Sequence, residues 1–250
     1  MHIAILTFDG FNELDSLIAY GMLSRIRLLG DRQWQVSIAS PTPRVSSMNG
    51  LTIDAHIGLS EACGADAVLV GSGMKTREVA ENRHIMAQLQ LDPKRQLIAA
   101  QCSGTFLLAR LGLTAGLSAC TDNTSKPWVQ AAGVQILNQP FVAHGNIATA
   151  GGCLSAQYLC AWLLTRLKGE DPAREVLHYF APVGEKDSYV ERAMGHVLPA
   201  PPSPPRPHPL FSLTLPTHVH TPPCRPPDWR PEHHQRQPYP GSLQPRHRQG

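Results

Sequence analysis

Short apolar runs alternate with segments of helical periodicity along most of the chain. The runs typical of buried strands lie at residues 2–8, 34–39, 67–70 and 97–100. Apolar residues at helical spacing lie at residues 13–29, 76–91, 153–167 and 171–180. Weaker patterns predict a hairpin at 45–53, a strand at 117–121, a helix at 126–132 and a strand or hairpin at 134–150. Strands that alternate with helices predict an α/β domain whose parallel sheet is covered on both faces.

Composition divides the chain near Leu198. Between Pro199 and Pro245 lie 16 of the 23 prolines, and no apolar periodicity remains there. We therefore predict one α/β domain over residues 1–198 and a Pro-, Arg- and His-rich tail over residues 199–250, disordered or polyproline-like. An SH3 ligand at residues 203–207 and a frameshifted or artefactual C-terminus are alternatives that the sequence leaves open.

The charge balance argues against a nucleic-acid partner for the domain. The tail has six arginines against Asp228 and Glu232, a balance of +4 in a chain of net charge +3, which leaves the domain at −1. No apolar run is long enough to span a bilayer, so we expect no membrane contact.

The cysteines favour a reducing compartment. All six lie far apart, without a disulfide framework, a signal peptide or the C-x-x-C spacing of a zinc site, so we expect a cytoplasmic protein without a metal. Cys153 and Cys160, seven residues apart on a predicted helix, are expected to share its buried face.

Cys102 lies in the sharp turn between the predicted strand at 97–100 and an amphipathic helix whose apolar face includes Phe106 and Leu107. At such a turn a side chain faces the unpaired amides and the positive dipole end of the helix, which favour a thiolate over a thiol. The small pair Ser103-Gly104 lets the turn pass close to the strand, as in a nucleophile elbow. Most cysteines are inert core residues, but an inert one needs no such turn.

Two other strand ends are predicted to meet Cys102 at the carboxyl edge of the sheet. The first carries Glu13 and Asp15, either of which is a candidate general acid or base. The second is the turn Gly71-Ser72-Gly73, whose backbone amides are candidate donors to an oxyanion. Each feature alone is more often structural, as a surface carboxylate or a plain tight turn.

Four motifs make the chain resemble the ThiJ/PfpI family, the flavodoxin-like branch of the class I glutamine amidotransferase superfamily. They are Ala99-Ala-Gln-Cys-Ser-Gly-Thr-Phe-Leu-Leu-Ala109, Gly10-Phe-Asn-Glu-Leu-Asp15, Val68-Leu-Val-Gly-Ser-Gly73 and Ala148-Thr-Ala-Gly-Gly152. The resemblance covers about residues 2–195. Within the family the chain is most similar to isonitrile hydratase-like proteins and to the ligand-sensing domains of AraC-type regulators.

The resemblance implies a flavodoxin-like three-layer sandwich and assigns roles at the elbow. Cys102 would be the nucleophile, Asp15 its acidic partner, and the amides of Gly73 and Ser103 the oxyanion donors. It also implies a homodimer and neither a metal nor an organic cofactor. We place Gly71, Ser72, Gly104 and Asp122 with the residues around the oxyanion or substrate.

The sequence departs from the family at two positions. Many members have a Thr-Thr-His pattern after the elbow helix, whereas this chain has Cys120-Thr121-Asp122, and a carboxylate there would repel a thiolate. The turn at residues 71–73 also lacks the usual Pro-Gly-Gly. These departures argue against protease or deglycase chemistry that depends on the histidine.

The sequence thus favours a cysteine-dependent hydratase or hydrolase that acts on a small electrophilic molecule such as an isonitrile. Two alternatives stay open. The first is a redox or ligand sensor that uses the same sulfur without turnover. The second is a small-molecule-binding domain linked to transcription regulation, which is weakened because the tail cannot form a DNA-binding helix pair.

Overall fold

A computed structural model describes residues 1–198 of this chain. The predictions made for the tail, residues 199–250, lie outside the described residues. Within residues 1–198, a seven-stranded sheet has the strand order β10-β11-β7-β6-β1-β2-β5. All neighbouring pairs are parallel except β10 with β11.

The strands of this sheet are β1 (His2–Leu6), β2 (Gln35–Ser40), β5 (Ile57–Gly58), β6 (Ala67–Val70), β7 (Leu97–Gln101), β10 (Phe141–His144) and β11 (Ile147–Ala150). Two smaller pairs are β3 (Arg44–Ser46) with β4 (Thr52–Asp54), and β8 (Ser118–Ala119) with β9 (Gln135–Ile136). The runs predicted at 2–8, 34–39, 67–70 and 97–100 all supply strands of the main sheet. The residues predicted as a strand at 117–121 form instead the short β8 outside it.

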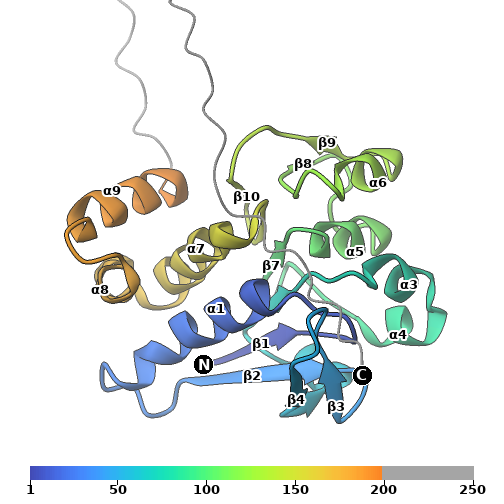
Figure 1. Ribbon diagram of the computed structural model, residues 1–250, viewed down its shortest axis with the longest axis horizontal. Coiled ribbons are helices and arrows are strands. Elements are labelled where there is room, and N and C mark those ends of the chain that lie inside the picture. The colour runs from blue at the N-terminus through green and yellow to red at the C-terminus, as the bar shows by residue number, and fades with distance from the viewer. Residues whose placement is uncertain (199–250) are drawn as a thin grey trace, which may run out of the picture. The chain divides into compact units, whose positions relative to one another are not determined.

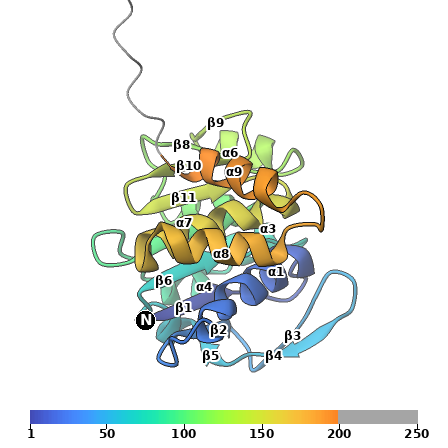
Figure 2. The ribbon, with the colours of Figure 1, turned by 90° about the vertical axis from the view of Figure 1, so that its left-hand side faces the viewer.

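Helices cover both faces of the main sheet (Figure 1). The helices on one face are α1 (Glu13–Ser24), α7 (Ala156–Lys168), α8 (Glu170–Phe180) and α9 (Lys186–Val197), which Figure 2 shows from their own side. Those on the other face are α2 (Leu59–Ala62), α3 (Thr76–Glu81), α4 (Arg83–Gln88) and α5 (Gly104–Arg110), and α6 (Lys126–Ala131) packs against α5. The predicted α/β three-layer architecture is confirmed.

Alternate residues of the central strands are buried in two separate hydrophobic cores, one on each face of the sheet. Ile3 and Ile5 of β1 face the core under α1 and α7, whereas Ala4 and Leu6 face the core under α3 and α5. Such two-sided burial explains why the strands are continuous apolar runs rather than alternating ones. Helix α7 is buried without a break from its start to Leu164, because it lies between the sheet and three other helices.

Three helix predictions differ from the structure at particular residues. The helix predicted at 76–91 is broken at Asn82, whose side chain accepts hydrogen bonds from the amides of His84 and Ile85 and so begins α4. The helix predicted from Cys153 starts as the 3₁₀ turn η2 (Cys153–Ser155). The helix predicted at 13–29 ends at Ser24 and continues as the 3₁₀ turn η1 (Arg25–Arg27). Helix α9 has no counterpart in the sequence predictions.

The strand order changes direction next to β1, because the chain places β2 on one side of β1 and β6 and β7 on the other. In doubly wound sheets the ligand crevice lies outside the carboxyl ends of the strands at this switch point. Here the residues that follow β1, β6 and β7 include Asp15, the turn at 71–73 and Cys102. The topology therefore brings the predicted site residues to one edge of the sheet.

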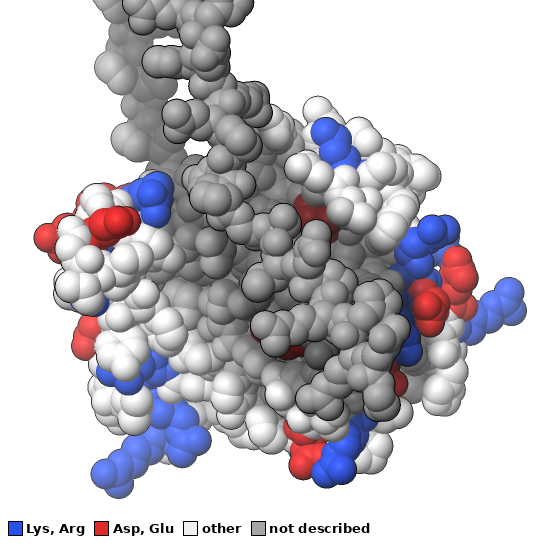
Figure 3. Space-filling view, viewed as in Figure 1, with Lys and Arg blue, Asp and Glu red and all other residues white. Residues whose placement is uncertain are grey.

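The charged surface matches the balance expected from the sequence. Basic and acidic side chains are interspersed at the margin of the described residues on the face in Figure 3. Among residues 1–198, no helix combines the length and the hydropathy required to cross a membrane.

Gly104 supplies a test of the contact between the elbow helix and the sheet. A Cβ at this position would lie 2.5 Å from the carbonyl oxygen of Val70 and 2.7 Å from that of Gly71. We expect Gly104→Ala to lower the free energy of unfolding by roughly 1–3 kcal/mol, as overpacking does. Gly195→Ala is the control, since this glycine is exposed on α9 and nothing lies within 4 Å of the position that a methyl group would take there; it should stabilise by roughly 0.5–1 kcal/mol. Urea unfolding measures both, and equal effects would contradict the close contact.

Candidate active site

Cys102 occupies a strained backbone conformation at the end of β7. Its φ is 48°, and it is the one non-glycine residue at positive φ among residues 1–198. The amide donates to the carbonyl oxygen of Ala150 at 2.8 Å, and the carbonyl accepts from Oγ1 of Thr121 at 2.8 Å. Strain of this kind persists only where surrounding contacts fix it, and it concentrates at functional sites. The predicted nucleophile elbow is therefore present in the structure.

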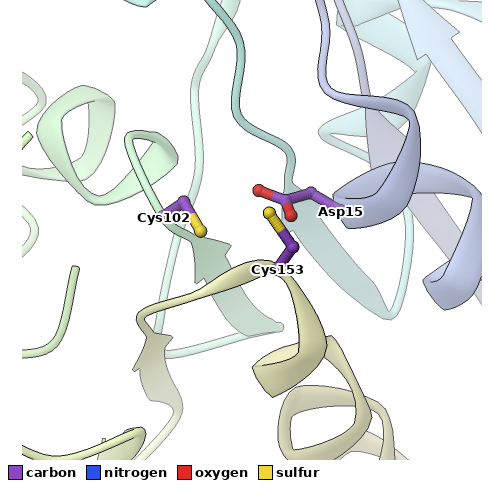
Figure 4. Close-up of side chains that lie close together, drawn as sticks. All are labelled: Asp15, Cys102 and Cys153. Atoms are coloured by element: carbon purple, nitrogen blue, oxygen red, sulfur yellow. The ribbon is translucent and has the colours of Figure 1, made fainter. Parts of the chain in front are cut away.

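Asp15 is the carboxylate beside Cys102. It lies in the first turn of α1, is fully buried, and accepts a hydrogen bond on Oδ2 from the Ser72 hydroxyl. Its other oxygen, Oδ1, accepts no hydrogen bond from any group within residues 1–198. Figure 4 shows the carboxyl group beside the sulfur atoms of Cys102 and Cys153.

The second sulfur belongs to Cys153, which the sequence analysis placed on a buried helix face with Cys160. That prediction is wrong, because Cys153 lies in the η2 turn ahead of α7, half-buried at the site, while Cys160 is buried in the core. The sulfurs of Cys102 and Cys153 and a carboxyl oxygen of Asp15 all lie within 4.8 Å of one another (Figure 4). Asn12 donates from Nδ2 to the Cys153 sulfur at 3.3 Å.

Burial and mutual repulsion control the protonation of this group. Burial, followed by the charge of Asp15, raises the pKa of the Cys102 thiol, and the same two causes raise the pKa of Cys153. Burial also raises the pKa of Asp15, against the hydrogen bond from Ser72, which lowers it. The sequence analysis predicted a lowered pKa for Cys102. That prediction is wrong, because burial and the charge of Asp15 both favour the protonated thiol.

Glu13, the other candidate carboxylate, binds the turn between β3 and β4 rather than Cys102. Its side chain accepts hydrogen bonds from Ser47 and from the side chain of Asn49 at 2.9 Å, in the turn between β3 and β4. The hydrogen bond from Ser47 is the main reason that the pKa of Glu13 is lowered. The choice that the sequence left open is thereby decided, since Asp15 and not Glu13 meets the sulfur.

The predicted oxyanion donors differ in what their amides do. The amide of Gly71 donates to the carbonyl oxygen of Leu6 at 3.0 Å, so the prediction that it faces an oxyanion is wrong. The amide of Gly73 donates to Oγ of Ser103 at 3.2 Å, and that hydroxyl also lies 2.7 Å from Oγ1 of Thr76. The amide of Ser103 has no acceptor among residues 1–198. Ser103 thus offers a free backbone donor next to the sulfur, while its side chain holds the turn at 71–73.

Gly104 and Asp122 have structural roles near the pocket. Gly104 allows α5 to approach the carbonyl oxygens at the end of β6, and it does not line the pocket. Asp122 accepts hydrogen bonds from the amides of Thr124 and Ser125 at 2.9 and 3.0 Å, and so orders the chain before α6. Its charge contributes only weakly to the raised pKa of Cys102, behind burial and Asp15.

A pocket of about 330 Å³ opens above the two sulfurs. Cys102 and Cys153 line it together with Asn12, Ser72, Gly73, Ser103, Asp122 and Gly152. The rest of its wall is Met48, Met74, Thr124, Ser125 and Trp128. Cys102 is only 5% exposed, yet it lines this pocket, which gives a small molecule a route to the residue.

Cys153, Asn12 and Trp128 are pocket residues for which the sequence predicted no role at the site. Cys153 and Asn12 follow strand ends, as Asp15 and Cys102 do, and this position was the signal that could have identified them. Trp128 gave no such signal, because it reaches the pocket from α6, whose place in the fold depends on tertiary packing against α5.

The structure combines a doubly wound α/β sheet, a strained cysteine at a strand-to-helix turn and a carboxylate beside that cysteine. These features define a class of proteins built around a cysteine elbow. The sequence profile of the DJ-1/PfpI family matches residues 1–166. The chain belongs to the DJ-1/PfpI family, whose members include cysteine-dependent enzymes and sensors. The family predicted from the four motifs is confirmed, while the narrower likeness to isonitrile hydratase-like proteins and AraC-type regulators stays a prediction.

Solved structures share the fold at low sequence identity. Schizosaccharomyces pombe DJ-1 is 16% identical with a TM-score of 0.63, and the match covers 73% of this chain and 100% of that one. A cysteine-to-alanine mutant of a DJ-1 superfamily protein from Salmonella typhimurium is 23% identical with a TM-score of 0.62, over 72% of this chain and 98% of that one. Toxoplasma gondii DJ-1, solved in an oxidised form, is 19% identical with a TM-score of 0.61, over 71% and 96%. No curated protein matches the sequence.

The charge of Asp15 yields a prediction for the reactivity of Cys102. Asp15→Asn removes a negative charge that raises the pKa of the thiol, so the pH profile of Cys102 alkylation should move to lower pH and the rate at neutral pH should rise severalfold. Peptide mass spectrometry after iodoacetamide treatment measures this rate. Glu13→Gln, which changes a carboxylate two residues away that is bound to the hairpin, should leave the profile unchanged. An unshifted profile in Asp15→Asn would show that the two groups are not coupled.

Proposed function

We propose that this protein is a cysteine-dependent enzyme of the hydratase or hydrolase type that acts on a small, uncharged electrophile such as an isonitrile. The observation that carries the proposal is the pairing of Cys102, which lines the pocket, with the buried carboxyl group of Asp15 beside it. A thiol beside a buried carboxyl group can add to an electrophilic carbon while the carboxyl group moves the proton.

The pocket wall supports an uncharged substrate. Among residues 1–198, its lining includes no Lys, Arg or His, and the one carboxylate there, Asp122, is hydrogen-bonded to backbone amides. Such a wall offers an anionic substrate no counter-ion. Met48, Met74 and Trp128 provide apolar and aromatic surface that suits a hydrocarbon substituent.

The first chemical step would form a bond between the Cys102 sulfur and the terminal carbon of the isonitrile. The ionised form of Asp15 takes the thiol proton as the sulfur attacks, and then delivers this proton to the same carbon. The product is a thioimidate, in which that carbon carries one hydrogen, the sulfur and a double bond to nitrogen. Because both pKa values are raised, the pair retains a proton for this transfer near neutral pH.

Water completes the reaction. A water molecule adds to the thioimidate carbon as Asp15 takes one of its protons and passes it to the nitrogen. The carbon–sulfur bond of the tetrahedral intermediate then breaks, the hydroxyl proton returns to the sulfur, and an N-substituted formamide leaves. The net change is the addition of one water to the isonitrile. The backbone amide of Ser103 is placed to donate to the oxygen that water brings.

A redox sensor is the second candidate function. The pairing of Cys102 with a second pocket thiol, Cys153, favours it, because peroxide that enters the pocket meets both sulfurs. In this role Cys102 reacts once and signals by its oxidation state, without turnover.

Kinetics with alkyl isonitriles tests the enzyme. Wild-type protein should convert them to formamides, followed by nuclear magnetic resonance, and Cys102→Ser should abolish this turnover because the hydroxyl is a much weaker nucleophile. Asp15→Asn should reduce kcat by about 10²–10⁴-fold, as expected when a general acid–base is removed.

Cys63→Ser is the matched control, since Cys63 is half-buried but bonded to the carbonyl oxygens of Leu59 and Gln88, away from the pocket. Turnover that survives Cys102→Ser would exclude the sulfur as nucleophile. If neither isonitriles nor glyoxals are converted and peroxide oxidises Cys102 rapidly, the sensor replaces the enzyme.

A further inference from the structure

We infer that Cys102, Cys153 and Asp15 form a binding site for one thiophilic divalent cation of the Zn²⁺ class. Three elements supply the ligand atoms, namely the elbow after β7, the η2 turn after β11 and the first turn of α1. Two thiolates and a carboxylate together match the sulfur and oxygen ligands that Zn²⁺ takes in proteins. The inference goes beyond the proposed function, because binding of a cation requires no turnover.

The spacing of the three ligand atoms is close to that of a metal site. All of them lie within 4.8 Å of one another. Around a tetrahedral Zn²⁺, thiolates at about 2.3 Å from the metal are separated by about 3.8 Å. The two sulfurs therefore have to close by about 1 Å at most, and a sulfur and the carboxylate oxygen by about 1.3 Å at most, which side-chain rotation can supply.

Asp15 provides an independent sign that a ligand is expected at this position. The residue has no exposed surface, and its Oδ2 is held by the hydroxyl of Ser72. Its Oδ1 has no hydrogen-bond partner within residues 1–198, and the carboxyl group lies beside the two sulfurs (Figure 4). A buried carboxylate oxygen without a partner is costly, and a cation bound between it and the sulfurs removes that cost.

Amide groups outside the three ligands are placed to support thiolates. Nδ2 of Asn12 donates to the Cys153 sulfur at 3.3 Å, and Nε2 of Gln101 lies 3.5 Å from the Cys102 sulfur. Gln101 is anchored in turn by its hydrogen bond to the carbonyl oxygen of Gly152 at 2.7 Å. Hydrogen bonds of this kind orient metal ligands and raise affinity.

The fourth coordination position would open into the pocket. Cys102 and Cys153 line the pocket, while Asp15 lies behind them. A cation held by three protein ligands would keep this position for water or a small molecule. It would also occupy the sulfur that the proposed reaction uses, so the bound cation would block thiol addition.

Co²⁺ spectroscopy on the reduced full-length protein tests the site, because thiolate ligands give Co²⁺ a charge-transfer absorption that oxygen and histidine ligands do not. We expect this absorption to saturate at one Co²⁺ per chain and to disappear when Zn²⁺ is added. Residues 199–250 contain six histidines and Cys224. Histidines there can add bound Co²⁺ but no thiolate band.

Variants assign the band to the cluster. Cys102→Ser and Cys153→Ser should each reduce it by half or more and weaken Co²⁺ binding at least about tenfold, since loss of a ligand costs at least as much as loss of an outer hydrogen bond. Cys63→Ser and Cys224→Ser should keep the full band, and circular dichroism checks that each variant is folded.

Two results would overturn the inference. The first is the absence of a thiolate band from the reduced wild-type protein. The second is an undiminished band in folded Cys153→Ser. Neither result bears on isonitrile turnover, which is measured on metal-free protein, so the cation site and the proposed reaction can fail separately.

Discussion

The backbone of Cys102 holds a conformation that most side chains avoid, and the rest of the site is arranged by the contacts that keep it there. Its amide donates to the carbonyl oxygen of Ala150 in β11, and its carbonyl oxygen accepts from the hydroxyl of Thr121. Gly104, which has no side chain, lets the N-terminus of α5 pack closely against the end of β6. Loss of any of these contacts would allow the turn to relax toward an ordinary φ. Relaxation would withdraw the sulfur from the carboxyl edge of the sheet, where α1 and η2 bring Asp15 and Cys153.

Once the elbow is fixed, the chemistry of the site follows from crowding of acidic groups. Asp15 is fully buried with the two thiols beside it, and burial raises the pKa of all three groups. The charge of Asp15 further raises the pKa of both thiols, whereas the hydrogen bond from Ser72 lowers the pKa of Asp15. Two uncharged side chains donate hydrogen bonds to this group. The hydroxyl of Ser72 donates to the Asp15 carboxylate, and the side-chain amide of Asn12 donates to the Cys153 sulfur. Within the described part of the chain, residues 1–198, no side chain of Lys, Arg or His lines the pocket to neutralise the group. The protonation state of these three groups therefore depends on what enters the pocket.

The sequence was informative wherever local pattern and chain topology decide the outcome. Apolar runs located the main strands, and the strand-to-helix turn located Cys102, because both are properties of adjacent residues. The sequence could not decide whether Asp15 or Glu13 contacts Cys102, because both carboxylates lie in the same helical turn. The hairpin that binds Glu13 is distant in sequence, so its contact with Glu13 could not be foreseen. Cys153 was misplaced because a buried helix face explained its spacing from Cys160 equally well. Its true position depends on the η2 turn, which apolar periodicity does not detect.

The error about the Cys102 pKa has a more general cause. A helix N-terminus is visible in sequence, whereas burial and the approach of a carboxylate from another element are not, and the latter two dominate here. Burial and the carboxylate therefore both favour the protonated form of the Cys102 thiol. In the reaction that we propose, Asp15 takes the thiol proton as the sulfur attacks the electrophile. The same carboxylate oxygen can instead face a cation, in which case the thiols lose their protons to the metal rather than to a substrate. In the two proposals above, proton transfer and metal binding thus compete for the carboxyl group of Asp15, and the occupant of the pocket would decide between them.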